Sequence, residues 1–113
     1  MNSMPLKWIA LPQNGGYQLS DVRNVLYCES DGNYSKVYLK GGGRHVACRK
    51  LKDIEALLPT EYFVRIHHCY LVNLMHVKKY HKGDGGQVEL TNGLRLDVSR
   101  RKKADFMARL IVV

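Results

Sequence analysis

Apolar and polar positions alternate along most of the chain in short runs that are separated by glycine, asparagine and aspartate. Residues 34–40, YSKVYLK, alternate strictly between the two kinds of position, which is the two-residue period of a strand with one wet face. The run at 24–30, NVLYCES, precedes it across Asp31-Gly32-Asn33. Together these segments predict a β-hairpin.

Further glycine-rich turns predict more hairpins downstream. GGG occupies 41–43, GDGG occupies 83–86 and TNG occupies 91–93, and such stretches end strands and reverse the chain. The strands that they separate are 44–48, 75–81, 87–90 and 94–98. The apolar YLVNL at 70–74 is predicted to be a strand that anchors a turn.

Two stretches are predicted to be helical. Residues 50–58 carry apolar side chains on one stripe and end at Pro59, which cannot continue a helix. A second helix begins after Ser99, a residue type that caps helix N-termini. The apolar positions are Leu51, Ile54, Leu57 and Leu58 in the first helix and Phe106, Met107 and Leu110 in the second. The fold class is therefore mainly β with short α-helices.

Length and composition indicate one folded domain. With 113 residues and 45% hydrophobic content, we expect a single domain at 7–113, preceded by a tail or linker end at 1–6. The sequence lacks a stretch apolar enough to span a bilayer and the pattern of a signal peptide, so we expect a soluble, cytoplasmic protein without a membrane partner. The odd set Cys28, Cys48 and Cys69 favours reduced thiols over disulfides.

Charge adds an anionic partner to this picture. The formal net charge is +8, and residues 65–113 carry 10 of the 18 Lys and Arg but only 4 of the 10 Asp and Glu. Arg100 to Lys103 fill the first turn of the second predicted helix, where the helix dipole makes each cation cost on the order of 0.3–1 kcal/mol. A solvated charge run is the simple interpretation. An external phosphate or guanine that compensates these cations is the sharper one.

Metal and catalytic sites are not expected. His67, His68 and Cys69 are consecutive, and on a strand their side chains would alternate between faces rather than converge on one ion. The same alternation separates Cys69 from His68 as a nucleophile and base pair. Phosphate-binding loops and hydrolase motifs are lacking. We therefore expect no catalytic residue, no metal and no cofactor, and the protein is not predicted to be an enzyme.

Three segments together carry a family resemblance. VLYCESDGNYSKVYL, LKDIEALLPTEYFVRIHHCYLVNLMHVKKY and VSRRKKADF closely resemble the LytTR (LytR/AlgR-type) DNA-binding domain of bacterial transcription regulators over roughly residues 5–110. The stretch from Phe63 to Asn73 is the most specific part. The resemblance implies an elongated antiparallel β fold whose loops enter successive major grooves of DNA, with paired repeat sites occupied by two protomers.

Carried over position by position, the resemblance implies base contacts from three stretches. They are Tyr34 or Ser35 after the first turn, His68 in RIHHCY, and Arg100 in VSRR. Candidate phosphate contacts surround them and comprise His67, Cys69, Arg101 and Lys102, with Lys36 and Arg49 as weaker candidates.

Two positions need further comment. For His67, a structural role in which the ring holds the turn by a backbone hydrogen bond weighs as much as a phosphate contact. The chain departs from the commoner family pattern at His68, where a longer basic or amide side chain is expected, and at Cys69, where a hydroxyl is common. We therefore expect the base preference at this step to differ.

The resulting prediction is sequence-specific binding of double-stranded DNA by a bacterial transcription regulator, with two protomers on the DNA. The chain is then either the output domain of a response regulator in a two-component system, with a receiver domain or sensor kinase acting upstream, or a stand-alone regulator. Two alternatives fit the basic charge: a β-rich RNA-binding module, and a domain that binds an acidic protein.

Overall fold

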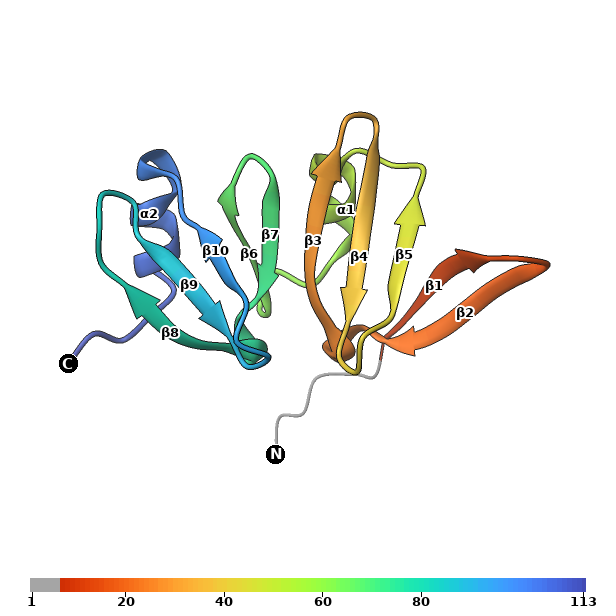
Figure 1. The fold of residues 1–113 in the computed structure, drawn as a ribbon, viewed down its shortest axis with the longest axis horizontal. Helices are drawn as coiled ribbons and strands as arrows, with labels where there is room; N and C mark the ends of the chain where they lie inside the picture. Colours follow the sequence, from red (N-terminus) through yellow and green to blue (C-terminus); the bar gives the residue numbers. More distant parts are fainter. Residues whose placement is uncertain (1–6) are drawn as a thin grey trace.

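The computed structural model describes residues 7–113, which form antiparallel β-sheets with two short α-helices (Figure 1). The helices are α1 (Leu51–Leu57) and α2 (Arg100–Met107). The strands are β1 (Trp8–Gln13), β2 (Gly16–Asp21), β3 (Val25–Asp31), β4 (Tyr34–Leu39), β5 (Arg44–Ala47), β6 (Phe63–His67), β7 (Tyr70–Asn73), β8 (Val77–His81), β9 (Gln87–Leu90) and β10 (Arg95–Asp97). The predicted fold class is confirmed.

The strands form three sheets among the described residues. A five-stranded sheet has the order β5-β4-β3-β7-β6, a three-stranded sheet has the order β10-β9-β8, and β1 pairs with β2. The hairpin β6–β7 is thus inserted beside β3, which comes from much earlier in the chain. In Figure 1 the three-stranded sheet and α2 lie at one end of the molecule, and the β1–β2 hairpin projects at the other.

The predicted hairpins form at the predicted turns. β3 pairs with β4 so that Asp31 faces Tyr34, and Gly32 takes a φ of +62° in the turn between them, a conformation that glycine adopts without steric cost. The glycine-rich turns also separate β8, β9 and β10. The strand expected from residue 75 begins only at Val77, because Leu74–His76 form a 3-10 turn.

The β1–β2 hairpin was not predicted from the sequence. Its turn contains Asn14 and Gly15, and Gly15 has a φ of +82°. An Asn-Gly pair between two extended runs is a strong hairpin signal, so this element had a local signature that the pattern of apolar positions obscured. The hairpin carries Trp8, Tyr17 and Leu19 largely exposed.

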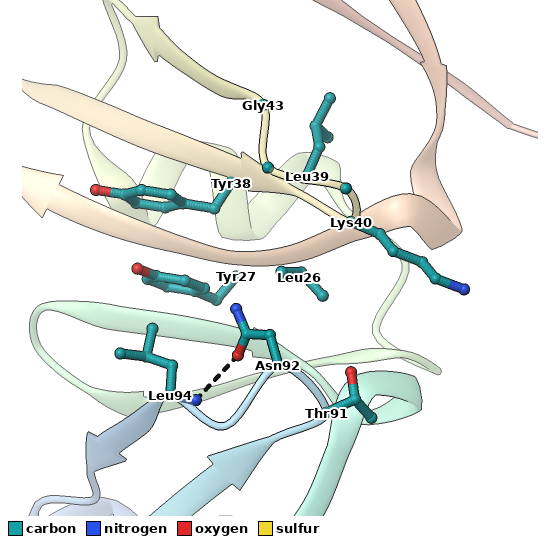
Figure 2. Close-up of a pocket in the computed structure, with 11 residues that line it drawn as sticks. Leu26, Tyr27, Tyr38, Leu39, Lys40, Gly43, Thr91, Asn92 and Leu94 are labelled. Atoms are coloured by element: carbon teal, nitrogen blue, oxygen red, sulfur yellow. Dashed lines mark hydrogen bonds between the residues drawn. The ribbon is translucent and has the colours of Figure 1, made fainter.

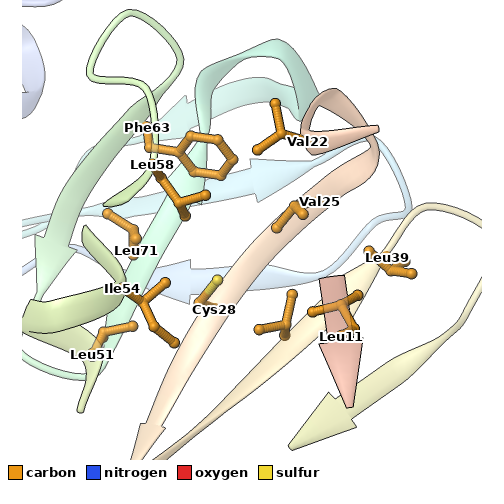
Figure 3. Close-up of a cluster of buried hydrophobic side chains, with 11 residues drawn as sticks. Leu11, Val22, Val25, Cys28, Leu39, Leu51, Ile54, Leu58, Phe63 and Leu71 are labelled. Carbon is orange, nitrogen blue, oxygen red and sulfur yellow. The ribbon is translucent and has the colours of Figure 1, made fainter. Parts of the chain in front are cut away.

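Two hydrophobic cores lie on opposite faces of the five-stranded sheet. One packs α1 and Leu11 of β1 against β3, β4, β6 and β7 (Figure 3). The other joins the sheet to the three-stranded sheet and to Phe106 of α2. In β7 the adjacent Leu71 and Val72 belong to different cores, as the alternation of a strand requires. The central strands β3 and β7 are therefore apolar on both faces.

Asn73 is the polar exception at the end of β7. Its side chain is fully buried, donates to the carbonyls of Arg23 and Val25, and accepts from the backbone N–H of Met75. Because every polar group of the amide has a partner, its burial is tolerated. Through the bond from Met75, Asn73 also caps the turn at Leu74–His76.

Both helices form, but each buries fewer residues than predicted. Leu51, Ile54 and Leu58 are buried, whereas Leu57 is 64% exposed, because steps of about 100° place it at the edge of their stripe. Phe106 is buried, whereas Leu110 lies beyond the end of α2 and is exposed. The expected tail at 1–6 lies outside the described residues. Within residues 7–113, each helix is too short to cross a membrane.

We expect thiol reagents to distinguish Cys28 from Cys48 in the folded protein. Cys28 is fully buried and burial raises the pKa of its thiol to about 12, whereas Cys48 is exposed. Since the thiolate is the reactive form, iodoacetamide near neutral pH should alkylate Cys48 quickly and Cys28 only after unfolding. Peptide mass spectrometry measures the difference, and equal labelling of the two in the native state would contradict the placement of Cys28.

Candidate nucleic-acid interface

Turns that are far apart in the sequence end at one edge of the molecule. The β3–β4 turn, the β6–β7 turn and the start of α2 lie along the upper edge in Figure 1, and the chain leaves β5 at the same edge. We call this edge, made of residues 31–36, 49–50, 67–69 and 99–103, the interface edge. It contains all the residues that the sequence nominated for DNA contact.

Two backbone hydrogen bonds connect the parts of the interface edge. The N–H of Ser30 in β3 donates to the carbonyl of Cys69 at 2.9 Å, and the N–H of Ser99 donates to the carbonyl of Ile66 in β6 at 2.8 Å. The β6–β7 hairpin is therefore bonded on one side to the β3–β4 hairpin and on the other side to the cap of α2. Neither bond follows from local sequence, because each joins segments more than thirty residues apart.

Arg65 organises the β6–β7 turn, and sequence reasoning missed it. Its guanidinium donates to the carbonyls of His67 and His68 at 2.8 and 2.5 Å, and to the carboxylate of Glu55 at 2.9 Å. The planar fork of arginine suits several simultaneous acceptors. A basic residue within the otherwise apolar run FVRI was the available signal.

The side chains of His67, His68 and Cys69 converge, and the sequence expectation that they could not is wrong. β6 ends at His67, so His68 and Cys69 lie in a turn and not on a strand. Their ligating atoms lie within 4.8 Å of one another, and the two imidazole rings stack with centroids 4.5 Å apart. Alternation between faces applies only while the backbone stays extended.

His67 has the structural role that the sequence left as an alternative. Its Nδ1 accepts the backbone N–H of Cys69 at 3.1 Å. Burial, and secondarily the charge of His68, lowers the pKa of His67, which favours the neutral ring that this bond requires. A neutral ring that accepts through Nδ1 carries its proton on Nε2. Only that second nitrogen remains for a contact outside the protein.

The start of α2 is positive and partly open. The Ser99 hydroxyl accepts the N–H of Lys102 at 3.2 Å, which caps the helix. Arg100 and Arg101 are exposed, and Lys102 is half-buried. A hollow of about 230 Å³ is lined by Arg65, His68, Ser99, Arg101 and Lys102. Among the described residues, none of the four basic side chains at 100–103 forms an ion pair, so their charges remain available to an external anion.

In the β3–β4 hairpin, the side chains of Tyr34 and Ser35 differ in exposure. Tyr34 is 50% exposed, whereas Ser35 is fully buried and donates its hydroxyl to the carbonyl of Arg49 at 2.8 Å. Ser35 is therefore removed from the candidate base contacts, because strand alternation turns it into the core. Its hydrogen bond instead holds the exposed Arg49 beside the turn. Lys36 is half-buried, with its ammonium 3.7 Å from the carboxylate of Asp31.

A second hollow, of about 540 Å³, lies at the opposite ends of the strands (Figure 2). Tyr27 and Tyr38 stack there with ring centroids 4.4 Å apart, and Asn92 and Leu94 approach from the β9–β10 turn. The hollow lies between the five-stranded sheet and the β9–β10 turn of the three-stranded sheet, away from the basic turns. It is therefore not part of the interface edge.

Comparisons with known proteins agree with this geometry. The family model of the LytTr DNA-binding domain matches residues 16–111. The transcriptional regulatory protein BtsR of Escherichia coli K12 is 34% identical over 107 residues, which is 88% of this chain and 41% of BtsR. The CO-responsive transcriptional regulator RcoM of Rhodospirillum rubrum is 37% identical over 67 residues, which is 58% of this chain and 28% of RcoM. The chain thus spans less than half of either regulator.

A solved structure supports the fold independently. The LytTr DNA-binding domain of a Bacillus cereus response regulator superposes with a TM-score of 0.83, covering 93% of this chain and 97% of that one at 23% identity. The sheet order and the placement of the turns therefore belong to a known architecture.

We expect Arg65→Lys to loosen the β6–β7 turn without unfolding the chain. Lysine keeps the charge but cannot donate to the carbonyls of His67 and His68 and to Glu55 at once. Lost hydrogen bonds to a charged group cost about 1.5–3 kcal/mol. Denaturant unfolding should show such a decrease in the free energy of unfolding, with faster hydrogen exchange of the Cys69 amide. Unchanged exchange at Cys69 would mean that Arg65 does not hold the turn.

Proposed function

Because the chain belongs to the LytTR family of DNA-binding domains, we propose that it reads duplex DNA by sequence through the interface edge. The observation that carries this proposal is the meeting of three sequence-distant segments on one basic edge, through the bonds from Ser30 to Cys69 and from Ser99 to Ile66. Each segment ends in a turn or a helix start, which is the shape that enters a groove. The family assignment supplies DNA as the partner.

The three segments of the interface edge follow one another along the long axis of the molecule. The longest extent is 46 Å and runs horizontally in Figure 1, parallel to the interface edge. One helical turn of B-DNA rises about 34 Å. The 46 Å extent also includes the β1–β2 hairpin, which projects beyond the interface edge. We propose that the β3–β4 turn, the β6–β7 turn and the start of α2, which follow one another along this edge, enter grooves on one side of the duplex.

Three side chains are proposed to read bases. Arg100 can donate two hydrogen bonds to guanine O6 and N7, and His68 can donate to a base acceptor or accept from a base amine, depending on its tautomer. Tyr34 offers its hydroxyl or an apolar contact with a thymine methyl group. All three are exposed, as a residue that reaches a base edge must be.

The surrounding cations are proposed to hold phosphates. Arg101 and Lys102 line the hollow beside His68, and Arg49 is exposed beside the β3–β4 hairpin. Lys36, which is close to Asp31, and the half-buried His67 and Cys69 are secondary candidates. Such contacts fix the register of the protein on DNA and make affinity depend on salt. They also offset the unfavourable charge at the start of α2.

In the cell, we propose that the chain is the output domain of a bacterial transcription regulator in the cytoplasm, acting without catalysis. Two protomers on paired repeats, and a receiver domain or sensor kinase upstream, belong to the same proposal. The names of BtsR and RcoM, both transcriptional regulators, support it. The comparisons give no support to the alternative of an RNA-binding module.

We expect selection from a random duplex pool to recover one motif, repeated at a spacing of about one helical turn or a multiple of it. At fixed salt, structured RNA should not displace the selected duplex, and log K should fall steeply with log salt because several phosphates are neutralised. An enriched RNA, or a flat salt dependence, would contradict the proposal and favour an RNA or an acidic protein as partner.

We expect Arg100→Ala and Lys102→Ala to weaken DNA binding in different ways. Loss of a two-bond guanine contact by Arg100→Ala should cost about 1–3 kcal/mol and relax preference at one base pair. Lys102→Ala should lower affinity for all sequences alike and reduce the salt slope by about one. Binding curves on the selected duplex and on its single-base variants measure both effects.

Lys40→Ala is the matched control, because this exposed cation lies beside the hollow at the opposite ends of the strands. It should leave affinity and the salt slope unchanged. If Arg100→Ala kept the parent base preference, Arg100 would not be a base reader.

A further inference from the structure

The β6–β7 turn brings together three metal-binding side chains whose convergence DNA recognition does not require. One ring nitrogen of His67, one of His68 and the sulfur of Cys69 lie within 4.8 Å of one another. His67 and Cys69 are half-buried, whereas His68 is exposed. Imidazole and thiolate are preferred ligands of zinc and of neighbouring transition metals, and catalytic zinc sites use three protein ligands with water as the fourth.

We propose that His67, His68 and Cys69 form a binding site for a Zn²⁺-like transition-metal ion, with water completing the coordination. Metal–nitrogen and metal–sulfur bonds of about 2.0–2.3 Å in a tetrahedral site place ligand atoms about 3.5 Å apart. Atoms within 4.8 Å therefore need to approach by little more than about 1 Å. The exposed ring of His68 can make most of this movement by side-chain rotation.

Besides the bond to the His67 ring, hydrogen bonds that involve none of these three side chains hold the backbone of the turn. The guanidinium of Arg65 binds the carbonyls of His67 and His68, and the Ser30 N–H binds the carbonyl of Cys69. Ligands on an anchored turn lose less conformational entropy when an ion binds than ligands on a mobile loop. The turn is thus partly preorganised for a metal.

Metal binding has identifiable costs at this site. Coordination through either nitrogen of His67 removes the bond that its Nδ1 accepts from the Cys69 N–H, because Nδ1 would hold either the metal or the proton. The Cys69 thiol must also lose its proton. Arg101 and Lys102, which line the hollow next to His68, oppose a cation. We therefore expect weaker affinity than at a structural zinc site.

These costs give the ion a consequence for DNA, which rests on the proposed function. A metal on His68 occupies one of its ring nitrogens and fixes the tautomer and orientation of the ring that would contact a base, and the loss of the His67 bond alters the turn that presents it. Metal and DNA should therefore compete at the β6–β7 turn. By linkage, each must lower the affinity of the chain for the other by the same factor.

The site is tested first without DNA, by titrating the reduced, tag-free full chain with Co²⁺. Thiolate coordination should produce a sulfur-to-cobalt charge-transfer band in the near ultraviolet and d–d bands typical of four-coordination, and Zn²⁺ should abolish both. Cys69→Ser and His68→Ala should lose the charge-transfer band or weaken Co²⁺ binding strongly. A parent chain without the band would overturn the site, whatever its behaviour toward DNA.

Cys48→Ser is the matched control for an exposed thiol that binds metal by itself. Cys48 is exposed and lies outside the cluster, so this variant should keep the bands and the affinity of the parent. If Cys48→Ser lost the band while Cys69→Ser kept it, the proposed ligands would be wrong.

Competition is then measured on the selected duplex, with and without saturating Zn²⁺. We expect Zn²⁺ to weaken binding by the parent and Cys48→Ser chains by roughly tenfold or more, the effect of one lost base contact. Each variant is compared with itself, and the ratio should approach one for Cys69→Ser. Cobalt bands without any effect of Zn²⁺ on DNA affinity, or an increase in affinity, would overturn the competition. Failure to bind DNA without metal would overturn the proposed function. The Co²⁺ spectra, which are recorded without DNA, would still test the metal site.

Discussion

The β6–β7 hairpin is held on both sides by backbone hydrogen bonds, and the geometry of the interface edge depends on this constraint. The Ser30 N–H binds the carbonyl of Cys69, and the Ser99 N–H binds the carbonyl of Ile66. These bonds fix the position of the β6–β7 turn relative to the β3–β4 hairpin and to the start of α2. A surface of separate turns that enters grooves needs such fixed positions, because a displacement of about 1 Å weakens a contact between a side chain and its partner.

Burial of the central strands on both faces makes that constraint possible. β7 lies between β3 and β6 and contributes Leu71 to one core and Val72 to the other. A shift of one residue in its register would exchange these side chains and place the ends of the hairpin elsewhere. Asn73 adds a polar constraint at the far end of the strand through its bonds to Arg23, Val25 and Met75. The apolar cores thus determine where the polar turn lies.

The interface edge concentrates unfavourable features that an anionic partner relieves. Four cations lie at the positive end of the α2 dipole, where their charge is unfavourable unless an external anion offsets it. The β6–β7 turn presents two imidazoles and a thiol within 4.8 Å of one another. Positive charge favours phosphate, whereas the ligand cluster favours a Zn²⁺-like ion, and contact with DNA and with the ion would both involve His68. This overlap is the physical basis for competition between them.

The sequence by itself determined the local structure and the nature of the partner. Glycine, asparagine and proline positions set the turns and the end of α1, strand alternation identified the faces of β4, and the charge excess after residue 65 indicated an anion. The family resemblance nominated the segments that line the interface edge. Tertiary structure decided what alternation and spacing could not. It bonded the β6–β7 hairpin to β3 and to the cap of α2, gave Arg65 its role and brought His67, His68 and Cys69 together. The first outcome depends on hydrogen bonds between segments more than thirty residues apart, and the other two depend on β6 ending at His67, where the backbone turns. Local sequence patterns did not reveal these long-range bonds or this strand end.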